Sequence, residues 1–331
     1  MYTIVTCFPL AASHLAQIRL VAGSDIQVID SSQEKIGENI FSADIFCGHA
    51  KEPIDWPAVV AQGRLKWIQS TAAGLDHCLV PAVVESSILV SGCSGLFANQ
   101  VAEQTLALLT GLVRRLPVFF RAQLRRDYTR RPTDDLWGKS VGIAGLGGNG
   151  QRIAKVLRPL VDNIIATDLF HEHCQFLVET GVVDQIFPTE GLEDMLARID
   201  VLIVTLPLTE ENENRIGDLQ FRLMKPGAYL INVGRGSVVN TDSLIAHLLN
   251  GQLAGAGIDV VDPEPLPADS RLWELDNVII TPHVGAQSPL RIPVTTDLFC
   301  QNLLRFRAGT PLLNLVDKQL GFPRPEFRIP F

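Results

Sequence analysis

The chain has 331 residues, of which 47% are apolar and 19% charged, so it can bury the cores of about two domains and is not disordered. Its net charge of −8 argues against nucleic-acid binding, because phosphate backbones are bound by positive charge. It has no signal-peptide pattern, no apolar run near the roughly 20 residues of a membrane span, and no CxxC pair among six cysteines, so we expect a cytoplasmic protein with free thiols and no membrane contact.

Short apolar runs alternate with helical patterns over the first 95 residues. These segments cover residues 3–7, 15–22, 26–29, 43–47, 56–62, 67–70 and 88–91. Such alternation predicts a parallel sheet flanked by helices. This part of the sequence contains no GxGxxG motif of its own.

A long helical pattern follows from residue 99 to about residue 120, and we expect it to bridge two domains. Between it and the next strand the sequence is rich in arginine, at Arg114, Arg115, Arg121, Arg125, Arg126, Arg130 and Arg131. This cluster could bind nucleic acid or another anion, or it could form a solvated face or a subunit contact. The negative net charge favours the second interpretation.

Residues 139–170 contain a strand, a glycine turn, a helix, a second strand and an acid, in that order. The first run, 140–144, leads into Gly145, Gly147 and Gly150, which allow a tight turn, a close approach to a pyrophosphate and close helix packing. The second run, 163–167, ends at Asp168, which lies 168 − 145 = 23 residues after the first glycine. This carboxylate can accept hydrogen bonds from the ribose hydroxyl groups and repels a 2′-phosphate. The segment therefore predicts NAD (NADH) rather than NADP as cofactor.

Later strands of the nucleotide-binding sheet are expected at 201–205, 228–233, 255–260 and 278–280, and a last helix at 293–307. That helix would return the chain to the first domain. We therefore expect an α/β protein with two doubly wound parallel sheets, in which residues 99–288 form a domain inserted into a discontinuous domain of residues 1–98 and 289–331. The proline-containing tail, 320–331, is expected to be irregular.

Three charged or titratable residues each follow closely on a predicted strand. Arg235 lies in NVGRG (232–236), Glu264 in DVVDPEPL (259–266) and His283 in TPHVGA (281–286). Because the carboxyl ends of parallel strands line the ligand crevice, these side chains could converge there. Histidine can exchange the proton of a hydroxyl group, a carboxylate behind it favours the protonated imidazole, and arginine can bind a substrate carboxylate. Each residue alone could equally be a solvated loop residue, but the three together favour an active site.

The glycine turn with Asp168 and these three motifs resemble the D-isomer-specific 2-hydroxyacid dehydrogenase family, and the similarity extends from about residue 70 to about residue 316. The resemblance implies a Rossmann nucleotide-binding domain inserted into a flavodoxin-like substrate domain, with the active site in the cleft between them. It implies that His283 is the acid/base, Glu264 its partner and Arg235 a substrate-binding residue. It also implies a homodimer formed through the nucleotide-binding domains.

Further site residues are implied only by this resemblance. The backbone N–H groups of Ala73 and Gly74 would bind the substrate carboxylate, and Asn99 would lie near the nicotinamide and the substrate. Asp259 would hold the carboxamide, and the other cofactor contacts would be Asn149, Leu206, Val233, Gly234, His283 and Gly285. Ser70 stands in the stretch where phosphoglycerate dehydrogenases commonly have arginine, which disfavours a phosphorylated substrate, although Lys51, Arg64 and Lys66 could replace that arginine.

The sequence thus predicts an NAD(H)-dependent enzyme that interconverts a small D-2-hydroxy acid and its 2-keto acid, with a substrate of the hydroxypyruvate or glyoxylate type. The alternatives are phosphoglycerate dehydrogenase activity and an NAD-responsive binding protein without turnover. We expect no metal, because His171 and His173 have no further ligands nearby in the sequence.

Overall fold

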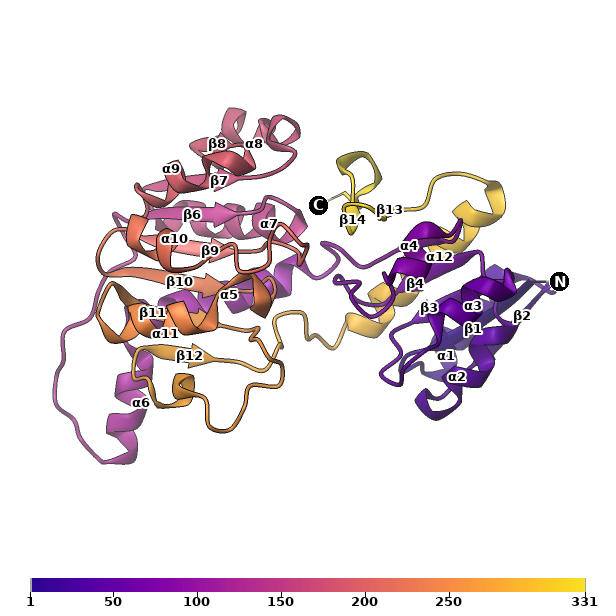
Figure 1. Cartoon of the computed structure of the whole chain (residues 1–331), viewed down its shortest axis with the longest axis horizontal. Coiled ribbons are helices and arrows are strands. Elements are labelled where there is room, and N and C mark those ends of the chain that lie inside the picture. Colours follow the sequence, from indigo (N-terminus) through magenta and orange to yellow (C-terminus); the bar gives the residue numbers. More distant parts are fainter. Residues whose placement is uncertain (1, 331) are drawn as a thin grey trace. The chain divides into compact units, whose positions relative to one another are not determined.

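The computed structural model describes residues 2–330, so Met1 and Phe331, the two ends of the expected first domain, lie outside the described residues. The chain forms two compact units, residues 1–97 with 288–331 and residues 98–287. Each unit is built around one parallel sheet, as Figure 1 shows. The expected fold class, two parallel-sheet α/β domains, is confirmed.

The sheet of the second unit has seven parallel strands in the order β12-β11-β10-β9-β6-β7-β8. They are β6 (Ser140–Ala144), β7 (Asn163–Thr167), β8 (Gln185–Phe187), β9 (Val201–Val204), β10 (Ala228–Asn232), β11 (Leu253–Ile258) and β12 (Val278–Ile280). Strand order reverses between β6 and β9, so the carboxyl ends of these two strands form the crevice in which such sheets bind ligands. Of the seven strands, only β8 was not predicted; it is three residues long and carries little apolar pattern.

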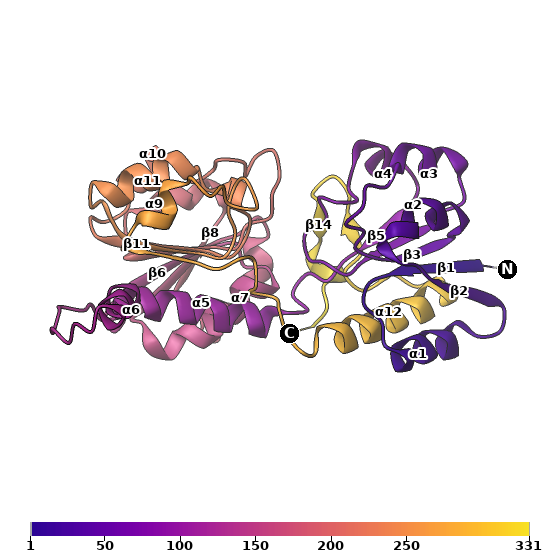
Figure 2. The ribbon, with the colours of Figure 1, turned by 90° about the horizontal axis from the view of Figure 1, so that it is seen from below.

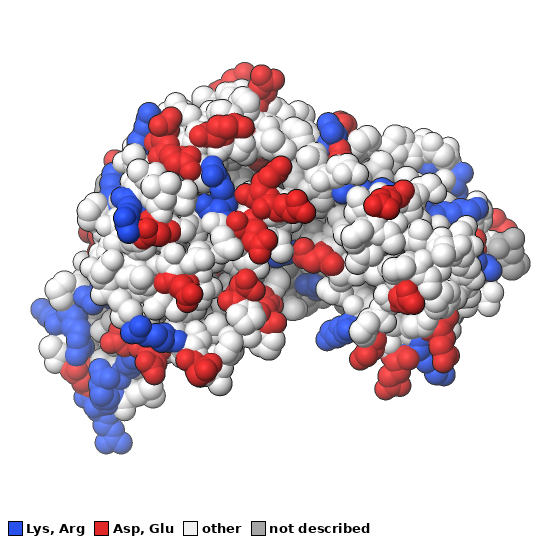
Figure 3. All heavy atoms as spheres, viewed as in Figure 1, with Lys and Arg blue, Asp and Glu red and all other residues white. Residues whose placement is uncertain are grey.

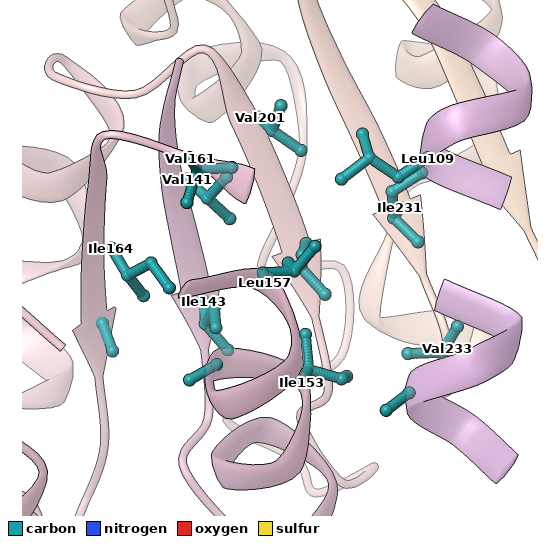
Figure 4. Close-up of a cluster of buried hydrophobic side chains, with 14 of the residues drawn as sticks. Leu109, Val141, Ile143, Ile153, Leu157, Val161, Ile164, Val201, Ile231 and Val233 are labelled. Carbon is teal, nitrogen blue, oxygen red and sulfur yellow. The ribbon is translucent and has the colours of Figure 1, made fainter. Parts of the chain in front are cut away.

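Helices cover both faces of this sheet, as Figure 2 shows. One face is covered by α5 (Ala98–Val113), α7 (Gly148–Leu157) and α8 (Phe176–Glu179), and the other by α9 (Leu192–Leu196), α10 (Asp218–Leu223) and α11 (Thr241–Leu249). In Figure 4, Leu109 of α5 and Ile153 and Leu157 of α7 point toward the strands. They pack with Val141 and Ile143 of β6 and Ile231 of β10, and all six side chains are buried. The glycine turn after β6 therefore lies on a rigid, fully packed base.

The single helix expected over 99 to about 120 is wrong, because the chain forms two helices there. Helix α5 ends at Val113, Arg115 takes a left-handed conformation with φ of 55°, and α6 runs over Leu116–Leu124. The break follows from Pro117, which has no N–H group and whose ring clashes with the carbonyl four residues earlier in a continuous helix.

Basic side chains gather over α6 and the loop after it, as Figure 3 shows. Three arginines of this cluster pair with nearby acids: Arg114 with Asp135 (2.8 Å), Arg121 with Asp276 (2.9 Å) and Arg131 with Asp127. The same segment exposes large apolar side chains, namely Leu116, Phe120, Leu124, Tyr128 and Trp137.

The sheet of the first unit has five parallel strands in the flavodoxin-like order β2-β1-β3-β4-β5. The strands are β1 (Tyr2–Cys7), β2 (Ile26–Asp30), β3 (Ile45–Gly48), β4 (Trp67–Ser70) and β5 (Leu89–Ser91). One face is covered by α1 (Ala12–Ala22) and α12 (Arg291–Ala308), the other by α2 (Ile36–Asn39), α3 (Trp56–Gln62) and α4 (Pro81–Glu85). Trp67 of β4 packs against Phe299 of α12 with ring centroids 5.4 Å apart, so both ends of the chain share this core.

The tail expected to be irregular contains some regular structure. Strands β13 (Val316–Asp317) and β14 (Phe322–Pro323) pair antiparallel, and the Arg324 guanidinium lies 2.7 Å from the Asp317 carboxylate. Eight short 3-10 helices complete the described chain: Gln33–Lys35, Ile40–Ser42, Arg158–Leu160, His171–Cys174, Thr189–Gly191, Gly236–Val238, Arg271–Glu274 and Pro325–Phe327.

The six cysteines are free thiols and all are buried, as expected for thiols outside a disulfide framework. Within residues 2–330, no helix has the length and the apolar character needed to cross a membrane.

Candidate functional site

The glycine turn after β6 has the geometry of a dinucleotide-binding turn. Gly145 has a φ of 98°, which side-chain-bearing residues rarely adopt. A Cβ at Gly150 would lie 2.0 Å from the Gly145 carbonyl oxygen, so only glycine lets α7 begin this close to the strand end. A Cβ at Gly147, by contrast, would meet no atom of the described chain within 4 Å, its immediate chain neighbours aside.

The amino end of α7 fits the pyrophosphate of a dinucleotide. Gly147 is its N-cap and supplies no side chain to the N–H groups of the first turn. These donors and the positive end of the helix dipole face the open space beside Gly147 and suit two phosphates. Asn149 lies in this first turn and is partly exposed.

Asp168 follows the last residue of β7 and is only 7% exposed. Its Oδ2 accepts the Leu146 N–H at 2.6 Å and its Oδ1 accepts the Phe170 N–H at 2.7 Å. Each carboxylate oxygen can accept a further hydrogen bond, such as one from a ribose hydroxyl group. The carboxylate thus has a structural role that the sequence analysis missed, because it fastens the glycine turn to β7.

Thr205, directly after β9, also holds the glycine turn. Its hydroxyl donates to the Gly145 carbonyl at 2.8 Å and lies 3.1 Å from the Ala144 carbonyl. The neighbouring Leu206 and the residue Val233, at the end of β10, are both predicted cofactor contacts. They lie at the same carboxyl edge of the sheet as the turn, since β9 pairs with both β6 and β10.

Arg235 lies in a turn that its neighbour Asn232 shapes. The buried Asn232 side chain accepts the Gly234 N–H at 3.1 Å and donates to the Arg235 carbonyl at 2.9 Å. The Arg235 guanidinium itself donates to the Gly234 carbonyl at 2.8 Å. Asn232 was not singled out from the sequence, although asparagine is a residue type that commonly bonds to turn backbone.

Asp259 organises the loop that carries His283. The carboxylate is 3% exposed and accepts the Thr281 hydroxyl at 2.6 Å, the Val284 N–H at 3.0 Å and the Gly285 N–H at 2.8 Å. The Asp259 carbonyl accepts the His283 N–H at 2.7 Å. These bonds hold His283 at a φ of 53°, an uncommon conformation for a residue with a side chain.

His283 and Glu264 form a direct pair. Nδ1 of the imidazole lies 2.9 Å from Oε1 of the carboxylate, and both side chains are nearly half exposed, at 44% and 45%. A proton on Nδ1 is held by the carboxylate, which leaves Nε2 for exchange with a ligand. This arrangement can therefore move a proton at a solvent-accessible position.

Arg235 and His283 follow strands of the same sheet. β10 pairs with β11 and β11 with β12 in parallel register, through Asn232↔Ile258 and Ile258↔Ile280. The carboxyl ends of β10, β11 and β12 therefore lie side by side, with neighbouring strands about 5 Å apart. Asn99 is exposed in the first turn of α5, and Gln104 of the same helix donates to the Thr281 hydroxyl at 2.9 Å.

The loop with Ala73 and Gly74 belongs to the first unit and follows β4. Ala73 is exposed, and neither of the two N–H groups has a hydrogen-bond partner among residues 2–330. His49, after β3, stacks on His77 of this loop with ring centroids 4.0 Å apart. Partial burial, the nearby charges of Arg291 and Lys51 and, in the opposite sense, Asp76 act on His49, and their net effect lowers its pKa.

His171 and His173 lie in a short 3-10 helix after Asp168. Across the described part of the chain, no three histidine, cysteine, aspartate or glutamate side chains are grouped so that they could hold a metal ion.

Comparisons with known proteins agree on one family. Residues 106–285 match the model of the D-isomer specific 2-hydroxyacid dehydrogenase, NAD binding domain. A glyoxylate reductase from Thermofilum pendens is 31% identical over 301 residues, which cover 89% of this chain and 87% of that protein.

Two solved structures have the same fold. A D-isomer specific 2-hydroxyacid dehydrogenase family protein from Aeromonas salmonicida has a TM-score of 0.79 and 29% identity, covering 96% of this chain and 99% of that one. A probable 2-hydroxyacid dehydrogenase from Rhizobium etli, solved in complex with NADP, has a TM-score of 0.79 and 23% identity, covering 97% and 100%.

Proposed function

The chain belongs to the D-isomer-specific 2-hydroxyacid dehydrogenase family, and from this premise we propose that it reduces a small 2-keto acid of the glyoxylate or hydroxypyruvate type with NADH. Family membership makes it an oxidoreductase of D-2-hydroxy acids that uses a nicotinamide cofactor. The observation that carries the proposed reaction is the pair of His283 and Glu264, 2.9 Å apart and open to solvent.

In the proposed reaction, His283 donates a proton from Nε2 to the keto oxygen. When bound, NADH supplies hydride to the keto carbon. Glu264 orients the imidazole through Nδ1, while Arg235 binds the carboxylate and the keto oxygen. The product is the 2-hydroxy acid, which is the D isomer where carbon 2 becomes a stereocentre, and the reverse direction uses His283 as base.

The substrate contacts that we propose in addition are Asn99 and the N–H groups of Ala73 and Gly74. Two adjacent N–H donors without hydrogen-bond partners among residues 2–330 suit a carboxylate. Asp259 is proposed to hold the carboxamide of the cofactor through the loop that it organises. The other proposed cofactor contacts are Gly145, Gly147, Asn149, Gly150, Asp168, Leu206, Val233, Gly234, His283 and Gly285.

We propose NAD rather than NADP because of Asp168. Its carboxylate lies directly behind the glycine turn, where it repels a 2′-phosphate, and the next two residues, Leu169 and Phe170, carry no positive charge. The Rhizobium etli structure was solved with NADP, so the affinity ratio of NADH to NADPH is the measurement that decides this point.

A phosphorylated substrate is disfavoured by the positions of two of its candidate cations. Arg64 pairs with Asp44 at 3.1 Å, and the Lys66 ammonium lies over the Tyr2 ring at 4.5 Å. Arg64 and Lys66 precede β4, whereas the Ala73–Gly74 loop follows β4 at the other end of the strand, about 13 Å away. Of the three candidate cations, only Lys51 lies at the same sheet edge as this loop.

We also propose that the protein is a cytoplasmic homodimer formed through the nucleotide-binding units. The apolar side chains of α6 that face solvent, Leu116, Phe120 and Leu124, support a protein contact there. The six buried free thiols are compatible with a reducing compartment. Light scattering of the purified protein tests the dimer.

The activity is tested by following NADH oxidation with glyoxylate, hydroxypyruvate, pyruvate and phosphohydroxypyruvate in parallel. The expected result is turnover with the first two acids, and a kcat/KM at least about tenfold higher with NADH than with NADPH. Preference for phosphohydroxypyruvate would favour a phosphoglycerate dehydrogenase. Tight NADH binding without turnover of any of the four would favour an NAD-responsive binding protein.

A further inference from the structure

The loop after β4 presents two neighbouring N–H donors directly after two residues whose own N–H groups are bound within the protein. The N–H groups of Thr71 and Ala72 are bound within the protein, to the Gly48 carbonyl at 3.3 Å and to the Ser70 hydroxyl at 3.0 Å. Those of Ala73 and Gly74 have no partner in the described chain. An anion binds such donors well only if they are already held in place, because ordering a loop on binding costs affinity.

Ser70 fixes the loop through the hydrogen bonds of its hydroxyl group. Its side chain is completely buried, and its hydroxyl bonds to the N–H of Ala72 and lies 3.3 Å from Nε2 of His77. One hydroxyl group therefore joins the beginning of the loop to its end. The end is fixed further, because the Trp56 indole donates to the His77 carbonyl at 3.0 Å.

The carboxyl-terminal segment also fixes the loop, through the hydrogen bonds of Asn314. The Asn314 amide donates to the carbonyls of Gly92 and Ser94, at 3.1 and 2.8 Å, and the residue between them, Cys93, donates its N–H to the Ala72 carbonyl at 2.9 Å. Asn314 is fully buried and has a left-handed φ of 52°. Its position is fixed in turn by the Ile329 N–H, which its Oδ1 accepts at 3.1 Å.

We propose that Ser70 and Asn314 are positioning residues, which keep the N–H groups of Ala73 and Gly74 in place for the carboxylate of the 2-keto acid. Neither side chain touches the substrate, and both act through Ala72. The inference rests on the proposed function, since it needs a carboxylate substrate at this loop. It also gives the tail after residue 313 a role in substrate affinity.

The first test is Ser70→Ala, with Ser86→Ala as the matched control. Ser86 makes the same kind of bond, accepting the N–H of Ile88 two residues ahead at 3.1 Å, but it precedes β5, at the opposite sheet edge. Because one hydrogen bond is worth about 0.5–1.5 kcal/mol, Ser70→Ala should raise KM for the keto acid and Ki for oxalate by ~3- to 10-fold. The value of kcat and the Kd for NADH should stay within about twofold, and Ser86→Ala should change none of these constants.

The second test is Asn314→Gly, which keeps the left-handed backbone and removes the amide. It should raise the same two constants, KM and Ki, in the same direction. Ser70→Thr, which retains the hydroxyl, should restore most of the affinity that Ser70→Ala loses. Thermal unfolding of every variant shows that the compared proteins are folded.

Unchanged KM and Ki in both Ser70→Ala and Asn314→Gly, with an active parent protein, would overturn this inference alone. An equal rise in Ser86→Ala would also overturn it, because the effect would then report general destabilisation. A parent protein that reduces no 2-keto acid would overturn the proposed function and this inference together.

Discussion

The glycine turn allows two single-methyl substitutions with opposite expected effects. Gly150→Ala places a Cβ 2.0 Å from the Gly145 carbonyl oxygen, and this backbone atom cannot move aside without distorting the turn. Relief requires a shift of about 1 Å, and overpacking of this kind costs typically about 1–3 kcal/mol. For a unit of this size, that cost lowers the melting temperature by about 3–10 °C.

Gly147→Ala adds the same methyl group at a position where, apart from the adjacent residues of the chain, no atom of residues 2–330 lies within 4 Å. The backbone of Gly147, with φ of −64° and ψ of −173°, is accessible to alanine. Stability should therefore change by less than about 1 kcal/mol. The methyl group would occupy the space proposed for the pyrophosphate, so NADH affinity should fall at least about tenfold.

The assay is a thermal melt of both variants without ligand, followed by a titration of NADH fluorescence. Gly150→Ala should lose melting temperature, whereas Gly147→Ala should keep it and lose affinity. Wild-type affinity for NADH in Gly147→Ala would refute the placement of the pyrophosphate. A wild-type melting temperature in Gly150→Ala would refute the close approach of α7 to the turn.

The remaining predictions concern the proposed proton transfer and the acid stability of the nucleotide-binding unit. His283→Ala should lower kcat by at least about 100-fold and leave the Kd for NADH within about twofold. Glu264→Gln should lower kcat by a smaller factor. Loss of both turnover and NADH binding in His283→Ala would argue against a role of His283 in proton transfer. The hydrogen bond with His247, and to a lesser degree Arg222, lowers the pKa of Asp218. The stability that this carboxylate contributes is therefore fully present above about pH 4 and is lost as the pH falls through the lowered folded-state pKa. Between about pH 6 and pH 3, the urea midpoint should fall less in Asp218→Asn than in the parent. Equal falls of the urea midpoint in the two proteins would contradict this assignment.

The dinucleotide unit could be predicted because its signals are local. The spacing of Gly145, Gly147, Gly150 and Asp168, between two apolar runs, requires no knowledge of distant contacts. The break between α5 and α6 was also visible, in Pro117, but the apolar periodicity on both sides outweighed it in the prediction. The strand β8 is too short for any periodic signal.

The supporting contacts of the site could not be predicted, because they join residues far apart in sequence. Thr205 bonds to Gly145 across 60 residues, and Asp259 bonds to Gly285 across 26 residues. Nothing near Thr205 or Asn314 in the sequence marks them as hydrogen-bonding residues of a turn. Asp168 was predicted from its spacing, but its bond to the Leu146 N–H depends on the fold of the turn.

The packing of α12 in the first unit has a consequence for the order in which the protein folds during synthesis. Phe299 and Leu303 of α12 complete the core under β1, β3 and β4. In the sequence, α12 begins about 200 residues after β5, so the amino-terminal strands leave the ribosome long before this helix. At roughly 5–20 residues per second, they stay incomplete for about 10–40 s, while residues 98–287 can already close their own sheet. The segment made first is therefore the one that finishes last, and nascent chains should expose it to chaperones until translation is nearly over.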